Sequence, residues 1–302
     1  MNSGVAGLHV TIKRHYSGMK LKEKLAISYI RAQLNILAMV SPKAAAQKAF
    51  QLFCTPRITH RKKPSFTTKG ERLSFKQDGH TIRGHRWLPR QASSDPLKKV
   101  LIAHGFESSS RNFDQYILPL LKKGYEVLAF DAPAHGQSGG KRITLPDYVR
   151  CLQTIQEEYG PVQSFMGHSL GGLALTLLME SLPHDGGARL VLIAPPCEMV
   201  AAVDSFFQLL QTGKEVRKEF DDLAYELFDH PFSWYSISRA LEQVHADILW
   251  LQDEDDKITP LKDALRVKEE QHPNIEFVIT KGLGHRRIYR DPAVMARIID
   301  FL

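Results

Sequence analysis

One serine between two glycines is the residue of this chain best placed to do chemistry. Residues 165–172 read FMGHSLGG, so Ser169 lies in a Gly-x-Ser-x-Gly pattern. An apolar run precedes the pattern and LALTLL follows it, which predicts a strand, a sharp turn and a helix. A serine at such a turn projects its hydroxyl, and the N–H groups at the helix start favour developing negative charge. The sequence therefore predicts a nucleophile, against the alternative of an ordinary serine in a glycine-rich turn.

A nucleophilic serine needs a base, usually a histidine oriented by a carboxylate. His285 follows the strand-like run IEFVI and a glycine-containing loop, a position from which a histidine reaches a site above a sheet. The segment QDEDDKITP at 252–260 lies between serine and histidine and follows another apolar run. The Asp-x-x-Thr-Pro spacing favours Asp256 as the acid that orients the imidazole, with Asp255 as the alternative. A surface histidine and a merely solvated acidic turn are the other readings of these two segments.

A tetrahedral intermediate also requires donors for its oxyanion. Residues 100–107 read VLIAHGFE, an apolar strand that ends in His-Gly. The glycine permits close approach, so the backbone N–H of Phe106 is one predicted donor. The backbone N–H of Leu170, directly after the serine, is the other.

Together these motifs resemble the α/β-hydrolase superfamily. The matching segments, in chain order over roughly residues 70–302, are HGF at 104–106, DAPAHGQS at 131–138, GHSLG at 167–171, DEDDKITP at 253–260 and GH at 284–285. Two positions depart from the family pattern, since Ala134 and Asp253 stand where glycine is usual. The resemblance implies a serine esterase, lipase, thioesterase, amidase or carbon–carbon bond hydrolase without metal or organic cofactor. A serine nucleophile argues against a dehalogenase or an epoxide hydrolase.

The elements that must position these residues alternate along the chain. Apolar runs predict buried strands at 100–104, 125–130, 162–166, 189–194, 247–251 and 275–279, and periodic segments predict helices near 113–122, 145–159, 170–182, 261–271 and 292–301. Residues 71–89, with Asp78-Gly79 at their centre, predict a leading hairpin. This pattern predicts an α/β fold with a mostly parallel sheet and helices on both faces.

Two regions depart from the alternation and set the predicted domains: a helical N-terminal arm at 1–65, a hydrolase core at 66–197 and 245–302, and a helical cap at 198–244. The cap segment is rich in aromatic and aliphatic residues. Most of these are expected to form the cap's own core, and a minority to line an acyl pocket over the active site.

The arm carries most of the basic charge. Residues 1–65 hold 12 Lys and Arg and one acid, Glu23, a net charge of +11, whereas the remaining residues hold 28 basic and 32 acidic side chains, a net charge of −4. The stretch 25–40 is apolar but interrupted by Arg31, Gln33 and Asn35, and too short to predict a membrane span. Three hypotheses remain for the arm: a helix packed on the hydrolase body, an amphipathic helix on an anionic membrane surface, and a nucleic-acid-binding arm, which the sparse aromatics disfavour.

Cysteine usage and composition complete the sequence hypothesis. Three scattered cysteines, Cys54, Cys151 and Cys197, indicate reduced thiols and a cytoplasmic location, with membrane association through the arm as an option. No Cys and His cluster has metal-ligand spacing. The predicted function is hydrolysis of a carboxylic ester or related acyl substrate by Ser169, His285 and Asp256. The alternatives are a thioesterase, a carbon–carbon bond hydrolase, or a non-catalytic protein that uses the fold to bind a ligand.

Overall fold

A computed structural model describes residues 21–57, 66–90, 97–184 and 186–302 of the 302-residue chain. The described residues form two compact units. The larger unit takes in Thr55–Cys197 and Ser236–Leu302, and the smaller one takes in the chain up to Cys54 together with Glu198–Tyr235. Residues 1–20 and 58–65 of the predicted arm lie outside the described residues. The predicted domain boundaries stay predictions.

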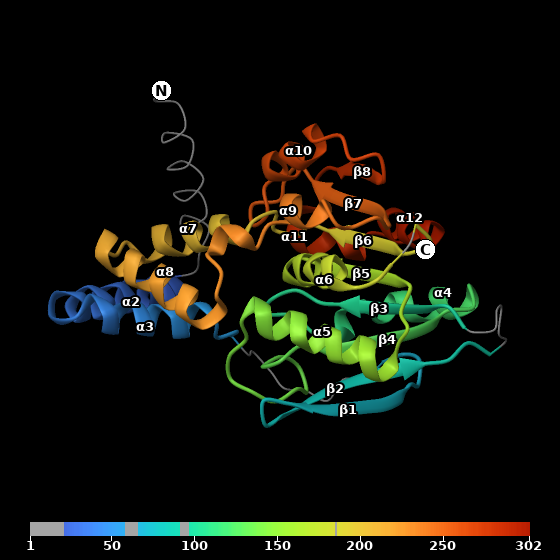
Figure 1. Cartoon of the computed structure of the whole chain (residues 1–302), viewed down its shortest axis with the longest axis horizontal. Coiled ribbons are helices and arrows are strands. Elements are labelled where there is room, and N and C mark those ends of the chain that lie inside the picture. Colours follow the sequence, from blue (N-terminus) through green and yellow to red (C-terminus); the bar gives the residue numbers. More distant parts are fainter. Residues whose placement is uncertain (1–20, 58–65, 91–96, 185) are drawn as a thin grey trace. The chain divides into compact units, whose positions relative to one another are not determined.

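The larger unit is built on an eight-stranded sheet with the order β1-β2-β4-β3-β5-β6-β7-β8 (Figure 1). The strands are β1 Glu71–Gln77, β2 His80–Trp87, β3 Lys99–Ala103, β4 Glu126–Asp131, β5 Ser164–His168, β6 Arg189–Ile193, β7 Asp247–Asp253 and β8 Ile275–Thr280. β2 pairs antiparallel with β1 and β4, and all later neighbours pair in parallel. Asp78 and Gly79 join β1 to β2 with φ values of 47° and 75°, the left-handed geometry of the predicted hairpin turn.

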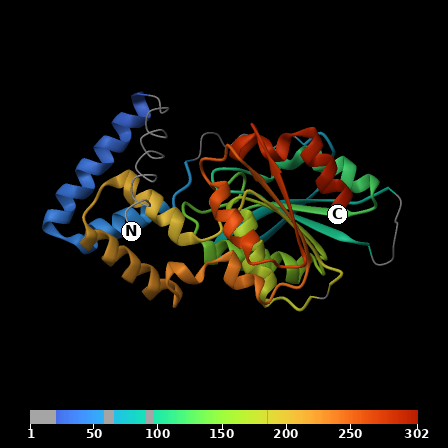
Figure 2. The same cartoon turned by 90° about the horizontal axis from the view of Figure 1, so that it is seen from above.

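Helices cover both faces of this sheet. In chain order they are η1 Ser110–Phe113, α4 Asp114–Lys122, α5 Leu145–Tyr159, α6 Leu170–Ser181, α9 Ile237–Leu241, α10 Leu261–Glu269, α11 Gly284–Arg287, η3 Ile288–Arg290 and α12 Pro292–Phe301. Figure 2 shows α4 and α12 on one side of the strands and α5 and α6 on the other. Every residue of β4 and β5 is buried, as expected for strands covered on both faces. The predicted mostly parallel α/β sheet with helices on both faces is confirmed.

Local capping explains where several helices begin. Thr144 and Asp147 form a reciprocal capping box at the start of α5, each accepting a hydrogen bond from the other's backbone N–H. Asp291 accepts hydrogen bonds from the backbone N–H groups of Ala293 and Val294 at the start of α12. Pro292 occupies the first helical position, where a proline leaves no backbone N–H without an acceptor. These caps fix the ends of helices on both faces of the sheet.

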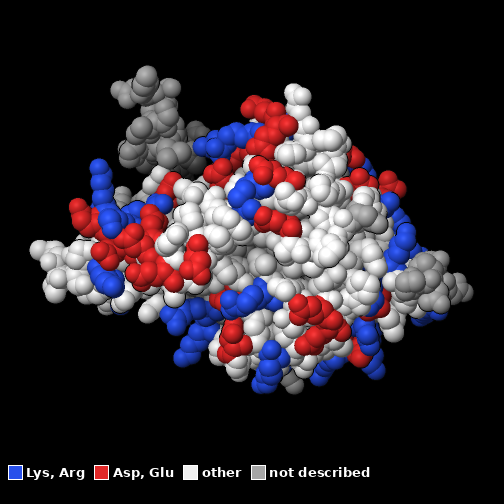
Figure 3. All heavy atoms as spheres, viewed as in Figure 1, with Lys and Arg blue, Asp and Glu red and all other residues white. Residues whose placement is uncertain are grey.

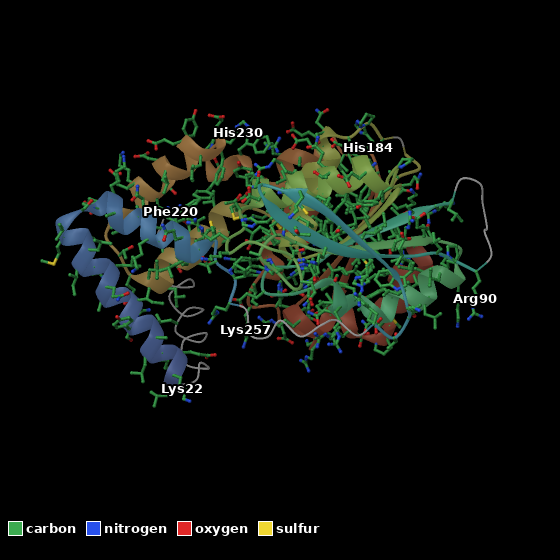
Figure 4. The ribbon with its side chains drawn as sticks, turned by 90° about the horizontal axis from the view of Figure 1, so that it is seen from below. Lys22, Arg90, His184, Phe220, His230 and Lys257 are labelled. Atoms are coloured by element: carbon green, nitrogen blue, oxygen red, sulfur yellow. The ribbon has the colours of Figure 1, made fainter. Side chains whose placement is uncertain are left out.

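The smaller unit is entirely helical in its described part. It contains α2 Leu21–Val40, α3 Pro42–Phe53, α7 Met199–Leu210, α8 Lys214–Phe228 and the short η2 Phe232–Trp234. Aromatic rings form its core: Phe50 of α3 lies 5.4 Å from Phe220 and 6.0 Å from Phe228 of α8, and Phe53 lies 5.1 Å from Phe206 of α7. Figure 4 shows Phe220 directed from α8 towards α3. The N-terminal helices therefore pack on helices of the predicted cap.

Because the two segments share one core, truncating Phe50 is expected to destabilise the helical unit by about 3–5 kcal/mol. Phe50 is only 9% exposed, so Phe50→Ala removes its ring from a packed aromatic cluster. Urea unfolding of the full chain followed by circular dichroism should show the transition of this unit at lower urea. Lys48→Ala, an exposed change on the same helix, should shift it by less than about 0.5 kcal/mol. Coincident curves for Phe50→Ala and wild type would contradict the shared core.

None of the helices in the described ranges has the length and apolar character needed to cross a membrane. The role of the segment 198–244 as a cover for the catalytic site, with a few apolar side chains in an acyl pocket, stays a prediction.

Candidate active site

Ser169 lies at the apex between β5 and α6, as the sequence predicts. Its backbone has φ 53° and ψ −127°, a conformation that costs a non-glycine residue energy and is held by the surrounding structure. The turn is possible because two chain segments approach very closely. A Cβ on Gly167 would lie 2.6 Å from the Cα of Gly172, and a Cβ on Gly171 would lie 2.4 Å from the carbonyl oxygen of Ala103. Both pattern glycines are therefore required for the tight strand-to-helix turn that presents the serine.

The structure brings His285 and Asp256 together. His285 Nδ1 lies 2.8 Å from Asp256 Oδ2, and the two side chains are 9% and 0% exposed. His285 was predicted on a loop but belongs to the one-turn helix α11, which begins directly after the glycine-containing loop. Since a carboxylate only accepts, Nδ1 carries the hydrogen of this bond and Nε2 is left as the basic nitrogen.

Asp256 is held in its ionised form by several donors. Its Oδ1 accepts from the backbone N–H groups of Ile258 and Thr259 at 2.8 and 3.0 Å, and its Oδ2 accepts from the Thr259 hydroxyl at 2.8 Å. Burial alone would raise the pKa of Asp256, but the hydrogen bonds from His285 and Thr259 outweigh it and lower that pKa. Asp256 is thus a buried anion that faces the imidazole.

The alternative acid, Asp255, has a different partner. Its Oδ2 accepts from the backbone N–H of Gly282 at 3.0 Å, in the loop that leads to α11. It makes no hydrogen bond to His285 among the described residues. Of the two acids that the sequence left open, only Asp256 therefore contacts the histidine.

His168, directly before the serine, connects the turn that carries Ser169 to the segment that carries His285. His168 Nε2–H donates to the carbonyl oxygen of His285 at 2.9 Å, and the two imidazole rings lie 4.8 Å apart. Burial, reinforced by the neighbouring His285, lowers the pKa of His168 to about 3, so the ring is neutral and donates at neutral pH. No hydrogen bond links Ser169 to His285 within the described part of the chain. A long nucleophile–base distance is common in unliganded sites and shortens when substrate binds.

The predicted oxyanion donors flank the serine. Gly105 lies so close that a Cβ there would be 2.9 Å from the Cβ of Ser169, which places the end of β3 directly against the nucleophile. Leu170 is the first residue of α6, where helix geometry provides no acceptor for its N–H. Within the described ranges, the backbone N–H groups of Phe106 and Leu170 donate to no protein acceptor.

A second buried histidine fixes the loop that carries Phe106. His135 Nε2 accepts from the backbone N–H of Glu107 at 3.0 Å while its Nδ1–H donates to the carbonyl oxygen of Pro133 at 2.9 Å. Burial and the neighbouring His104 lower the pKa of His135 to about 4, which keeps Nε2 available as an acceptor. Asp131 supports the same loop by accepting from the N–H and hydroxyl of Ser110. The segment 131–138, noticed only as a family motif, therefore supports the predicted oxyanion loop.

The sequence missed the part played by Asp253. Its Oδ1 accepts from the backbone N–H groups of Gly284 and Asp255 at 2.8 and 2.9 Å, and its Oδ2 accepts from the Thr280 hydroxyl at 2.7 Å and the N–H of Leu283 at 3.1 Å. Burial would raise its pKa, but these four donors lower it. A carboxylate in place of the usual glycine thus ties the loop before His285 to the end of β7.

Asp253→Asn is expected to lower kcat by about 10- to 100-fold with little change in KM, because small displacements of catalytic groups are costly. An amide presents its NH₂ group to donors that need an acceptor, so the loop before His285 must shift. Steady-state kinetics on an ester substrate measures the effect. Asp255→Asn, which loses one exposed contact, is the matched control and should stay within a few-fold of wild type. Equal kinetics for the two variants would show that Asp253 does not position His285.

The described residues contain no group of three or more His, Cys, Asp or Glu side chains arranged to hold a metal ion. The three cysteines are buried, and none of them forms a disulfide bond among the described residues. Hydrogen bonds among the protein's own residues account for the arrangement of His285, Asp256 and Asp253.

Comparisons with known proteins identify the family and the fold. The family model of the alpha/beta hydrolase family matches residues 100–298. A bifunctional esterase/perhydrolase of Acinetobacter calcoaceticus is 31% identical over 164 residues, which cover 53% of this chain and 55% of that protein. Mouse monoglyceride lipase is 30% identical over 128 residues, covering 39% of this chain and 40% of the lipase. The chain therefore aligns with about half of the length of these relatives, or less.

Solved structures share the fold. An esterase of Pyrococcus furiosus superposes with a TM-score of 0.57 at 21% identity, covering 82% of this chain and 96% of the esterase. The thioesterase domain from the curacin biosynthetic pathway superposes with a TM-score of 0.56 at 17% identity, covering 77% of this chain and 99% of that domain. With the family model matching well over half of its length, this chain belongs to the alpha/beta hydrolase family.

Proposed function

We propose that this protein is a serine hydrolase that cleaves a carboxylic ester or a related acyl substrate through Ser169, His285 and Asp256. The 2.8 Å contact between His285 Nδ1 and the buried carboxylate of Asp256 carries the proposal. This contact leaves the second imidazole nitrogen of His285 to act as a base. His168, which donates a hydrogen bond to the carbonyl oxygen of His285, directly precedes Ser169, whose backbone is strained. The esterase and the monoglyceride lipase among its relatives support an ester substrate.

In the proposed reaction each group has a distinct role. His285 Nε2 removes the proton of Ser169 as the serine oxygen attacks the acyl carbon, and Asp256 stabilises the resulting imidazolium. The N–H groups of Phe106 and Leu170 bind the oxyanion of the tetrahedral intermediate. His285 then returns the proton to the leaving group, which departs and leaves an acyl-enzyme. A water activated by the same imidazole hydrolyses this ester and restores the serine.

A substrate panel tests the reaction class. p-Nitrophenyl esters of graded chain length, a thioester and an anilide should be compared at equal concentrations, with Ser169→Ala as the blank for each. The expected result is a Ser169-dependent rate that is highest on one or more of the esters. A higher specificity constant for the thioester or the anilide would show that hydrolysis of that bond, and not of an ester, is the preferred reaction. No Ser169-dependent turnover of any of them would favour a ligand-binding role.

The rate is expected to rise with pH and then level off, because a protonated His285 has no lone pair at Nε2 to accept the serine proton. Burial lowers the pKa of both His168 and His135, to about 3 and about 4, so neither changes charge in the range where the limb is expected. The profile of kcat/KM between about pH 5 and 8 should therefore show one ionisation. Circular dichroism at each pH checks that the protein stays folded. A flat profile, or a limb in which log kcat/KM rises with a slope of two against pH, would contradict base catalysis by His285 alone.

A further inference from the structure

One face of helix α2 is exposed in the part of the chain that the structure describes. Six large apolar side chains on this helix are at least 62% exposed: Leu21, Leu25, Tyr29, Ile36, Met39 and Val40. At 3.6 residues per turn they fall within a sector about 100° wide and form a continuous stripe along the helix. We call these six residues the α2 stripe. Globular proteins rarely leave so much contiguous apolar surface exposed unless it binds something.

The opposite face of α2 already holds the helix in its own unit. Leu34 on that face is fully buried, and Arg31 Nε donates to the carbonyl oxygen of Leu209 on α7 at 2.7 Å. The α2 stripe is therefore not needed to dock the helix. A helix that packs through one face and exposes apolar side chains on the other has a second surface to bury.

Charge is distributed unevenly within the helical unit. α8 carries five acids, Glu215, Glu219, Asp221, Asp222 and Glu226, against the three basic residues Lys214, Arg217 and Lys218, and Figure 3 shows acidic side chains gathered on the helical unit. Figures 2 and 4 show α2 at one edge of the unit and α8 at the other, with α3 and α7 between them. The acidic surface of α8 therefore lies across the unit from α2.

The end of the α2 stripe is basic. Lys22 is exposed beside Leu21, where Figure 4 labels it, and the preceding sequence adds Lys13, Arg14 and Lys20. Glu23 is the only acid in residues 1–65. An apolar stripe that begins beside Lys22 and Lys24, with Glu23 as the one acid of the helix, matches an interface of acyl chains beneath anionic headgroups.

We propose that α2 is a membrane-surface helix that inserts the α2 stripe among the lipids of an anionic bilayer while Lys22 contacts the headgroups. The helix lies along the surface, since its opposite face stays packed on α7. The proposal concerns binding alone and holds whatever bond the catalytic site cleaves. A second copy of this chain is the competing occupant, and the experiment separates the two.

The full chain should be floated with vesicles of phosphatidylcholine alone and of phosphatidylcholine mixed with phosphatidylglycerol. We expect binding to the mixed vesicles, weaker binding to the neutral ones and partial release in high salt, because salt screens the attraction of the basic residues. Leu25→Ser with Ile36→Ser should lower the vesicle partition coefficient by about tenfold or more, since both side chains lose apolar burial. Lys22→Gln should lower it on mixed vesicles only.

The matched control lies on α8. Tyr225 and Leu227 are 56% and 55% exposed, so Tyr225→Ser with Leu227→Ser removes a similar apolar surface from the other edge of the same unit. This variant should bind vesicles like wild type, and thermal unfolding should show that both double variants are folded. Wild type that fails to float, or equal flotation of the stripe and control variants, would overturn the proposal. A wild-type dimer in solution that the stripe variant converts to a monomer would overturn it in favour of a second copy.

Discussion

Ser169→Ala is expected to lower ester turnover by about 10⁴-fold or more and to leave the fold unchanged. The substitution removes the hydroxyl but keeps the Cβ that packs against Gly105, so the turn retains its contacts. Without the oxygen no acyl-enzyme forms, and only the oxyanion donors and substrate binding still contribute. Steady-state rates on the best ester of the panel measure the loss.

Ser181→Ala is the matched control for this change. Ser181 stands at the far end of the same helix, α6, and donates its hydroxyl to the carbonyl oxygen of Leu178. Its loss should leave the rate within a few-fold of wild type. If purified Ser169→Ala keeps a substantial part of the wild-type rate, the nucleophile is a different residue.

Asp256→Asn should have the next largest effect, a fall in kcat on the order of 10⁴-fold. The asparagine amide donates where the carboxylate accepted, so His285 is held with its hydrogen on Nε2, and the nitrogen facing the serine can no longer accept a proton. The imidazolium also loses its buried counter-charge. Kinetics of the three Asp→Asn variants should rank the losses as Asp256 first, Asp253 second and Asp255 last. A larger loss in Asp255→Asn than in Asp256→Asn would move the acid by one position.

Much of the fold was predictable because the buried strands leave a simple signal. Strands covered on both faces read as short apolar runs, and the six predicted runs correspond to β3 through β8 to within a few residues at each end. The prediction that all six are buried is wrong for β8, which lies at the edge of the sheet and has no buried residue. The Asp78-Gly79 turn was equally clear, since both residues tolerate positive φ. The serine turn was the strongest prediction, because its two glycines are demanded by backbone contacts local to the motif.

The acid loop could be assigned only in part from sequence, which favoured Asp256 by its spacing to Thr259 and Pro260 but did not exclude Asp255. Asp253, Asp255 and Asp256 are chemically alike and stand within four positions. Asp256 faces His285 because its carboxylate accepts from the Thr259 hydroxyl and from the backbone N–H groups of Ile258 and Thr259. Asp253 faces the loop before His285 because β7 and β8 pair at that point. The contacts that anchor Asp256 are local and belong to the Asp-x-x-Thr-Pro spacing, whereas those of Asp253 join distant segments, which no local pattern encodes.

The arm was likewise only half predictable. Its apolar character was visible in the sequence, but the partner was not. Phe50 and Phe53 pack on Phe220 and Phe206, which come more than 150 positions later in the chain. Within the described residues α3 packs on helices of the predicted cap, whereas packing of the arm on the hydrolase body and its binding to a membrane stay hypotheses. α3 supplies the packed core, whereas the α2 stripe is the surface proposed to bind lipid.

Covalent labelling with a fluorophosphonate tests the central claim most directly, because the probe reacts only with a serine whose proton a base removes. The full chain should be incubated with the probe, digested and analysed by mass spectrometry, with Ser169→Ala and Asp256→Asn treated in parallel. The account predicts one phosphonylated peptide carrying the adduct on Ser169, no adduct in Ser169→Ala and much slower labelling in Asp256→Asn. An unlabelled wild-type protein, or an adduct on another residue that persists in Ser169→Ala, would contradict it.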